Sequence, residues 1–308
     1  MTPEAARAVT VEAPASSANL GPGYDALAMA LSLRLTVTVE AAAAGGGTMN
    51  VTGEGRDRLR PGGANRFTLA LERGLSELGA AIPAAWRISM RNEIPLGRGL
   101  GSSAAATVAG LVAAEALTQS SLGQDRLLAL ASQLEGHADN AAAVLLGGFV
   151  VVAAGRIVRY EPPPALRAVL FIPERELATD EMRAVLPPSV PHADAAHNVG
   201  RAALVVSAFA NGDLSLLAGM NDDRLHEPYR AAAFPQLVPL EHAAREAGAL
   251  GAALSGAGSS VLALCSSDEA AAEVGQALSS SAARLGLAGS VHILAPAIDG
   301  ARVAPTGG

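Results

Sequence analysis

A glycine-rich loop that runs into a helix constrains this chain more than any other feature. From Pro95 to Ala105 the sequence reads PLGRGLGSSAA, in which three glycines alternate before two hydroxyls and an alanine-rich run. Alternating glycines allow sharp turns and a close backbone approach to a ligand, because no Cβ intervenes. A helix that begins at Ser102 would direct free N–H groups and its positive dipole end at the loop. The pattern indicates a phosphate site, or a loop whose glycines serve steric needs alone.

This loop differs from two common nucleotide-binding patterns. No lysine follows Gly101, where Gly-x-x-x-x-Gly-Lys-Ser/Thr requires one, and the spacing is not that of Gly-x-Gly-x-x-Gly. All 22 basic residues of the chain are arginines, which excludes Schiff-base chemistry and the strand lysine of protein kinases. A bound nucleotide must therefore be held by backbone amides, a metal ion and arginine.

Composition narrows the class of protein. The chain has 308 residues and a net charge of −7 without a basic cluster, and aromatic residues are only 3% of it, which disfavours a nucleic-acid partner. The single cysteine, Cys265, excludes an internal disulfide and fits a reducing cytosol. No apolar segment like that of a signal peptide follows Met1, and the apolar residues 141–155 are too short for a membrane span. We expect a cytoplasmic protein that does not enter a membrane; a homodimer stays open.

Hydrophobic patterning predicts two α+β units, over residues 1–159 and 160–308, because the prolines at 162–164 form a stiff connector. Strands are expected at 9–13, 34–41, 86–92, 148–153, 167–172, 252–254, 261–265 and 290–294. Helices are expected at 65–78, 102–119, 125–135, 141–145, 179–184, 197–210, 214–219, 238–247 and 268–285. Residues 16–25 are expected to form a tight turn, 45–47 a hairpin tip or loop, and 304–308 a disordered tail.

Of four further polar segments, three each allow two interpretations and one favours a single interpretation. Residues 134–140 form either a helix end followed by an N-cap at Asp139 or Asn140, or a site with Glu135 as a metal carboxylate. Residues 19–25 alone favour a turn with a helix cap. Residues 222–230 form a solvated charged helix end, or present arginine to a carboxylate. Residues 254–260 form a tight connection, or a turn that closes over a phosphate or a substrate.

Taken in order, these motifs resemble those of the GHMP kinases. Residues 95–105 resemble the Pro-x-x-x-Gly-Leu-Gly-Ser-Ser-Ala motif, and residues 254–260 the C-terminal glycine motif. Within this superfamily, residues 14–25, 135–140, 147–149 and 223–230 resemble the signatures of the homoserine kinase family. The motifs span residues 9 to 267, nearly the whole chain. Ala138 and Ser259 replace the family's prolines and Tyr24 its phenylalanine; Ser259 puts the shape of the second glycine turn in doubt.

The resemblance implies a two-domain α+β fold, with an N-terminal ribosomal-protein-S5-like domain, a C-terminal ferredoxin-like domain and the active site between them. It implies phosphorylation of the L-homoserine side-chain hydroxyl by ATP with Mg²⁺, on the route to threonine. Another GHMP small-molecule kinase and a non-catalytic nucleotide- or metabolite-binding protein remain alternatives, although the paired arginines suit a substrate carboxylate.

Site residues follow from the same resemblance. ATP would contact Asn65, near adenine, and Pro95, Leu96, Gly97, Arg98, Gly99, Leu100, Gly101, Ser102, Ser103, Ala104 and Ala105, and Mg²⁺ would bind Ser103 and Glu135. Homoserine would contact Asn19, Asp25, Asn140, Thr179, Arg183 and Arg230. We expect direct attack by the substrate hydroxyl, oriented by Asn140, because phosphoryl transfer asks mainly for positioning and charge neutralisation. Asp139 and Asp25 remain possible bases.

Overall fold

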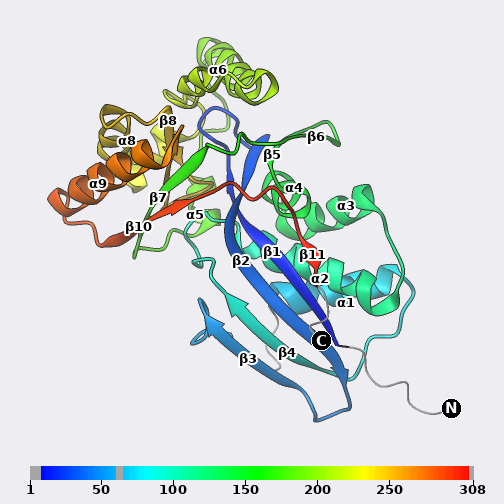
Figure 1. Cartoon of the computed structure of the whole chain (residues 1–308). Helices are drawn as coiled ribbons and strands as arrows, with labels where there is room; N and C mark the ends of the chain where they lie inside the picture. The colour runs from blue at the N-terminus through cyan, green and yellow to red at the C-terminus, as the bar shows by residue number, and fades with distance from the viewer. Residues whose placement is uncertain (1–7, 60–64, 305–308) are drawn as a thin grey trace.

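Two β-sheets, one built mainly from each half of the chain, organise the fold (Figure 1). The computed structural model describes residues 8–59 and 65–304. Within these residues the first sheet contains β1 (Val9–Ala18), β2 (Leu27–Ala42), β3 (Thr48–Gly53), β4 (Ala85–Asn92), β5 (Phe149–Ala153), β6 (Arg156–Tyr160) and β11 (Arg302–Val303). The second sheet contains β7 (Arg167–Pro173), β8 (Gly251–Leu254), β9 (Val261–Cys265) and β10 (Gly289–Leu294). The predicted α+β class is confirmed.

The long strand β2 is the spine of the first sheet. It pairs antiparallel with β1, with β4 and, near its start, with β5, whereas β3 runs parallel to β4. Helices α1 (Arg66–Glu77), α2 (Ser102–Thr118), α3 (Gln124–Glu135) and α4 (Asp139–Leu146) lie together on one side of this sheet (Figure 1). The glycine loop connects β4 to α2, so it lies where the sheet meets this helical layer.

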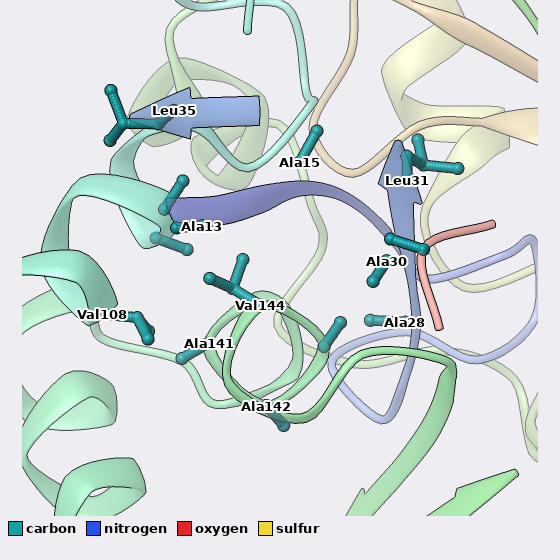
Figure 2. Close-up of a cluster of buried hydrophobic side chains, with 14 of the residues drawn as sticks. Ala13, Ala15, Ala28, Ala30, Leu31, Leu35, Val108, Ala141, Ala142 and Val144 are labelled. Atoms are coloured by element: carbon teal, nitrogen blue, oxygen red, sulfur yellow. The ribbon is translucent and has the colours of Figure 1, made fainter. Parts of the chain in front are cut away.

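Small side chains let α4 lie close to the sheet (Figure 2). Ala13 and Ala28 of the strands and Ala141, Ala142 and Val144 of the helix are all buried. Alanine buries little apolar area per residue, so stability here depends on many close contacts rather than on large side chains. This packing holds the first turn of α4, which carries two predicted site residues, at a defined position beside β1.

The second sheet has the order β10-β7-β9-β8, with every neighbouring pair antiparallel. Helices α8 (Leu237–Glu246) and α9 (Asp268–Arg284) pack against it. The remaining elements are α5 (Thr179–Ala184), α6 (His192–Asn211), the 3₁₀ helix η1 (Leu214–Met220) and α7 (Glu227–Ala233). Strand β11 returns to pair with β1, so the end of the chain completes the first sheet.

Every helix and strand predicted from the sequence is present, with differences at several places. Residues 16–18 extend β1 instead of starting the turn, and residues 214–219 form a 3₁₀ helix. Residues 45–47 form a loop and not a hairpin tip, because β3 pairs with β4 and not with β2. Strands β3, β6 and β11 and helix α7 were not predicted.

Three further expectations concern the C-terminal tail, a signal peptide and a membrane span. Ala304, the first residue of the tail expected to be disordered, donates its N–H to the carbonyl of Thr10 at 2.8 Å, as the ladder of β11 continues past Val303. Residues 305–308 lie outside the described residues, as do residues 1–7, which the signal-peptide expectation concerned. Among the residues that the structure describes, no helix has the length and apolar character needed to cross a membrane.

Candidate active site

A cavity of about 200 Å³ lies where the glycine loop meets elements of both halves of the chain. Its lining includes these predicted site residues: Asn19, Asp25, Pro95, Gly97, Arg98, Gly99, Leu100, Gly101, Ser102, Ser103, Ala104, Glu135, Asp139, Asn140, Thr179, Arg183 and Arg230. Ala105 is buried in α2 and does not line it. Residues far apart in sequence, from β1 to α7, therefore face one space.

The glycine loop needs its glycines for both conformation and space. Gly97, Gly99 and Gly101 have φ values of 67°, 73° and 68°, in the left-handed region that favours glycine. A Cβ on Gly99 would lie 2.0 Å from the carbonyl oxygen of Ser255, and one on Gly101 would lie 2.0 Å from the hydroxyl of Ser16. The steric interpretation of the loop is therefore confirmed, and it is compatible with a ligand role.

The start of α2 opens into the cavity. Within the described part of the chain, no side chain caps the N-terminus of α2, and Ser102 and Ser103 of its first turn line the cavity. The free N–H groups and the positive end of the helix dipole therefore favour an anion there.

The second glycine turn, residues 254–260, packs directly on the glycine loop. The hydroxyl of Ser255 donates to the carbonyl of Gly99 at 2.8 Å, and the N–H of Ser260 donates to the carbonyl of Arg98 at 3.1 Å. The Nε–H of Arg98 donates to the carbonyl oxygen of Pro173 at 2.7 Å. Residues 254–260 thus do more than connect two strands, because they lock the glycine loop from the side of the second sheet.

A carboxylate and two hydroxyls meet beside the loop. Glu135, the last residue of α3, has a side chain that is only 4% exposed, and it accepts hydrogen bonds from Ser103 at 3.0 Å and from Thr107 at 2.6 Å. The Nε of Arg66 lies 3.9 Å from the same carboxylate oxygen. Among the described residues, no cluster of three or more His, Cys, Asp or Glu side chains could hold a metal. A metal at Glu135 and Ser103 would therefore need phosphate oxygens and waters to complete its shell.

The start of α4 carries a second polar group. Its N-cap is Ala138, so the predicted N-cap at Asp139 or Asn140 is wrong, and both lie in the first turn. The Oδ1 of Asn140 accepts from the hydroxyl of Ser16 at 2.8 Å, and its Nδ2 makes a long contact of 3.5 Å with Oδ1 of Asp139. Because an amide nitrogen carries two hydrogens, its second N–H can donate to a ligand. The Oδ1 of Asp139 is 2.9 Å from Nδ1 of His137, and this hydrogen bond raises the pKa of His137.

Residues 19–26 form the turn between β1 and β2. No helix follows, so the predicted helix cap is wrong, because β2 begins at Leu27. The side chain of Asn19 accepts from the N–H of Asp25 at 3.1 Å and donates to the carbonyl of Gly256 at 2.9 Å. Asn19 and Asp25 both have positive φ, which the hydrogen bond between them helps to maintain. The turn thereby presents the carboxylate of Asp25 to the cavity.

Two guanidinium groups lie near the ring of Tyr24, and that of Arg183 pairs with Asp25. Arg183 makes two hydrogen bonds to Asp25, at 2.7 and 3.0 Å, and a third to the hydroxyl of Tyr24 at 2.9 Å. Arg230 is only 1% exposed, and its guanidinium carbon lies 5.5 Å from the centre of the Tyr24 ring. Thr179, at the start of α5, lines the same cavity.

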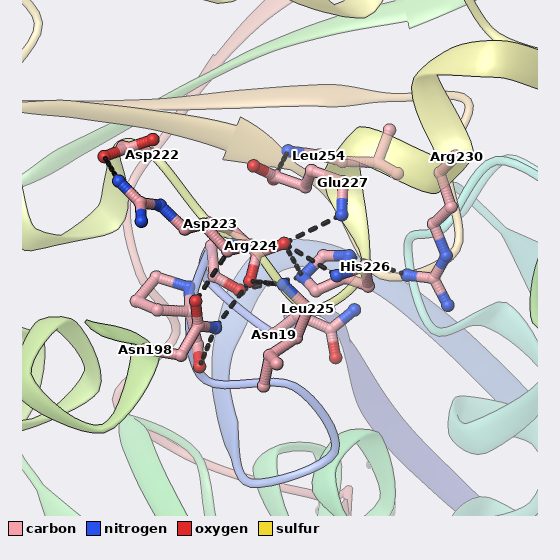
Figure 3. Close-up of polar contacts among 12 residues, drawn as sticks. Asn19, Asn198, Asp222, Asp223, Arg224, Leu225, His226, Glu227, Arg230 and Leu254 are labelled. Carbon is pink, nitrogen blue, oxygen red and sulfur yellow. Dashed lines mark hydrogen bonds and ion pairs between the residues drawn. The ribbon is translucent and has the colours of Figure 1, made fainter. Parts of the chain in front are cut away.

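The interpretation of residues 222–230 as a solvated helix end is wrong. Asp223, His226, Glu227 and Arg230 are all buried and bonded to other segments (Figure 3). The carboxylate of Glu227, for example, accepts from the N–H of Leu254 at 2.7 Å. These contacts fix α7, which carries Arg230, against the second glycine turn.

A second, largely apolar cavity of about 400 Å³ adjoins the first. Asn65, Phe67, Met90 and Leu96 line it, and Gly97, Ser102 and Ser103 line both cavities. Asn65 caps α1, accepting from the N–H of Thr68 at 3.0 Å. The two cavities together fit a ligand with a flat apolar ring at one end and phosphates at the other.

Sequence reasoning assigned no role to four residues that organise the site. Ser16 holds Asn140, Thr107 holds Glu135, His137 holds Asp139, and the imidazole of His226 contacts Arg230. Ser16, His137 and His226 lie within the segments that the sequence analysis singled out, so their positions were the available signal. The sequence around Thr107 gave no such signal, because Thr107 is one polar residue within a predicted alanine-rich helix.

Comparisons with known proteins agree with this geometry. The chain matches the GHMP kinases N terminal domain over residues 65–148 and the family described as GHMP kinases C terminal over residues 205–284. A homoserine kinase of Moorella thermoacetica is 41% identical over 297 residues, covering 95% of this chain and 99% of that protein. One of Streptomyces coelicolor is 43% identical over 272 residues, covering 86% of this chain and 87% of its own.

Solved structures give the same answer. The crystal structure of homoserine kinase from Cytophaga hutchinsonii matches with a TM-score of 0.86 and 31% identity, covering 99% of both chains. A mevalonate kinase structure, at a TM-score of 0.68 and 15% identity, shares the fold. The predicted GHMP fold is therefore confirmed, and the chain belongs to the homoserine kinase family of the GHMP kinases.

Proposed function

We propose that this chain transfers the γ-phosphoryl group of ATP to the side-chain hydroxyl of L-homoserine, giving O-phospho-L-homoserine and ADP, a step toward threonine. The observation that supports the proposal is one cavity with the glycine loop at one end and Asp25, Arg183 and Arg230 at the other. The second end has groups for both charges of an amino acid. The family membership of the chain supports the same acceptor.

The acceptor end discriminates among the substrates of the superfamily. A carboxylate between Arg183 and Arg230 would make charge-assisted hydrogen bonds, and Asp25 would bind an ammonium group. Mevalonate has a carboxylate but no amino group, and galactose has neither. An amino acid with a side-chain hydroxyl is therefore the acceptor that uses all three residues.

The donor end fits ATP and Mg²⁺. The loop amides and the uncapped start of α2 would bind the phosphates, and the apolar cavity beside Asn65 would take the adenine. The carboxylate of Glu135 and the hydroxyl of Ser103 are hard oxygen donors of the kind that Mg²⁺ prefers. Mg²⁺ supplies charge neutralisation for the phosphates of ATP in a chain that has no lysine.

The mechanism that the geometry favours uses no general base. The hydroxyl oxygen of homoserine attacks the γ-phosphorus, the bond to the β-phosphate oxygen breaks, and ADP leaves. The hydroxyl proton passes to the transferred phosphoryl group or to water. Asn140, held by Ser16, donates its Nδ2–H to the attacking oxygen and orients it. Asp25 is paired with Arg183, and Oδ1 of Asp139 already accepts from the N–H of Asn140 at 2.7 Å, which supports this route.

The test is an assay of ADP release with L-homoserine, L-serine, L-threonine, mevalonate and galactose, with the product identified by ³¹P NMR. Turnover with homoserine at the highest kcat/KM is expected. Turnover with another acceptor alone would indicate a different GHMP kinase, and no turnover with any would indicate a binding protein. Arg183→Ala and Arg230→Ala should each raise the KM for homoserine about tenfold or more, while the KM for ATP stays nearly constant. Unchanged KM values for homoserine in both variants would remove the carboxylate assignment.

The cellular setting belongs to the same proposal. Cys265 is a buried free thiol, which fits a reducing cytoplasm where ATP and amino-acid intermediates are available. A homodimer remains a separate proposal, which light scattering of the purified protein tests directly.

A further inference from the structure

His226 is fully buried between the β1–β2 turn and Arg230 (Figure 3). Its Nε2 lies 2.8 Å from the carbonyl oxygen of Gly21, and its Nδ1 lies 3.1 Å from Nη1 of Arg230. A backbone carbonyl only accepts hydrogen bonds and a guanidinium only donates them. Nε2 must therefore carry the hydrogen and Nδ1 the lone pair, so these two partners select a single neutral tautomer of the ring.

The surroundings of His226 keep the ring in this position. Its backbone N–H donates to Asp223 at 2.8 Å, and Asp223 also accepts from Asn198 at 2.6 Å and from the N–H of Glu227 at 2.8 Å. The ring of Tyr24 lies 5.3 Å from the imidazole, centre to centre. Burial lowers the pKa of His226 to about 4, so the ring stays neutral at the pH of a cell.

Arg230 differs from Arg183 in the groups that surround its positive charge. Arg183 forms an ion pair with Asp25, whereas no Asp or Glu oxygen among the described residues lies within 4.0 Å of the Arg230 guanidinium. Its other hydrogen bonds go to the carbonyls of Gly256, at 2.9 Å, and Met182, at 3.2 Å. All of its acceptors are therefore uncharged, so the guanidinium is oriented while its positive charge stays available for a substrate.

We infer that His226 is a positioning residue for the acceptor: it orients Arg230 through Nδ1 and ties it through Nε2 to the turn that carries Asp25. The carboxylate-binding and ammonium-binding groups would then sit at a set spacing, which selects an α-amino acid. This role rests on the proposed function, since it assigns the substrate carboxylate to Arg230. The positioning role requires a neutral side chain such as this imidazole, because an acidic side chain at the same place would cancel the charge of Arg230.

Three substitutions at His226 test separately its hydrogen bond to Arg230, its hydrogen bond to Gly21 and the charge of its side chain. His226→Asn can keep the acceptor in the position of Nδ1 and loses the donor to Gly21. His226→Gln can keep the donor in the position of Nε2 and loses the acceptor for Arg230. His226→Asp matches His226→Asn in shape and keeps the acceptor, but it adds a negative charge beside Arg230.

The experiment measures kcat and KM for homoserine and for ATP in wild type and in the three variants, with Tm as the control for folding. We expect His226→Gln and His226→Asp to raise the KM for homoserine about tenfold, with the KM for ATP nearly unchanged. We expect a smaller rise of about threefold in His226→Asn, because this variant keeps the acceptor for Arg230 and loses only the bond to Gly21. Wild-type values in His226→Gln, or equal losses in the Asn and Gln variants, would overturn this role alone. A wild-type protein that does not phosphorylate homoserine would instead overturn the proposed function and this role with it.

Discussion

The guanidinium of Arg183 and the carboxylate of Asp25 form a two-point ion pair, with Nη2–Oδ1 at 2.7 Å and Nη1–Oδ2 at 3.0 Å. These two side chains are the groups proposed to bind opposite charges of the acceptor. They are 35% and 36% exposed, so the pair is open to the cavity. An acceptor with both charges replaces one ion pair with two, whereas an acceptor with a single charge leaves one of the two residues without a partner.

Substitution of Asp25 should therefore change the choice of substrate. In Asp25→Asn, kcat/KM for homoserine should fall about tenfold or more, because a charged hydrogen bond contributes about 1.5–3 kcal/mol. With 4-hydroxybutyrate, which lacks the amino group, the value should stay constant or rise, since Arg183 is released from its pair. The measurement is kcat/KM for both acceptors, with Asp213→Asn at an exposed position as the control. Equal losses for the two acceptors would contradict the assignment of Asp25 to the ammonium group.

Loss of the Ser16 hydroxyl should act on the chemical step. In Ser16→Ala the amide of Asn140 loses the donor that fixes its orientation, and a neutral hydrogen bond contributes about 1 kcal/mol. We expect kcat to fall about fivefold, with the KM for ATP and for homoserine within a factor of two. Ser89→Ala, at an exposed position of β4, is the matched control. An unchanged kcat would separate Asn140 from the orientation of the attacking hydroxyl.

Sequence patterns identified the parts of this site that are local. The glycine loop and the start of α2 are contiguous, and α1 has its cap and its apolar spacing within one short segment. The partners of Thr107 and Ser16 lie 28 and 124 residues away, so no local pattern could reveal those bonds. Strand β3 escaped prediction because it is short and has only two apolar residues, Met49 and Val51, which are half-buried among exposed polar neighbours.

Residues 222–230 show how a charged sequence can become a buried one. Their charges suggested a solvated surface, but partners from distant segments satisfy them: Asn198 for Asp223, Gly21 for His226 and Leu254 for Glu227. Burial of charged and polar groups is tolerated only with such partners, and the sequence of the segment itself does not contain them.

Thr107 should control the affinity for Mg²⁺. Its hydroxyl donates to Glu135 at 2.6 Å from one turn beyond Ser103, so Thr107→Val removes the bond without a change in side-chain shape. The Mg²⁺ concentration for half-maximal activity should rise about threefold to tenfold, and binding of Mn²⁺ with ATP, measured by EPR, should weaken in parallel. Thr118→Val is the control on the same helix, because that hydroxyl bonds to the carbonyl of Ala114 instead. Equal metal affinity in Thr107→Val and wild type would show that Thr107 does not position Glu135.

Glu241 should make the stability of the protein depend on pH. Burial raises the pKa of its carboxyl to about 8, and its Oε1 has no hydrogen-bond partner among the described residues. In an unfolded chain the same carboxyl has a pKa of about 4.3. Between these two values the folded state binds more protons, so the contribution of Glu241 to the free energy of unfolding falls as the pH rises.

Glu241→Gln removes this titration while it keeps the size of the side chain. The variant should be more stable than wild type by about 1–2 kcal/mol at alkaline pH, and the difference should shrink toward zero in mildly acidic buffer, where the buried carboxyl of wild type is protonated. Urea unfolding of both proteins in the two buffers measures the difference, and the comparison cancels the titration of all other groups that the two proteins share. Glu246→Gln, an exposed acid on the same helix, should show no such trend. A stability difference that stays constant between the two buffers would mean that Glu241 is ionised in the folded protein at both pH values, because only a change in its protonation can make the two proteins diverge.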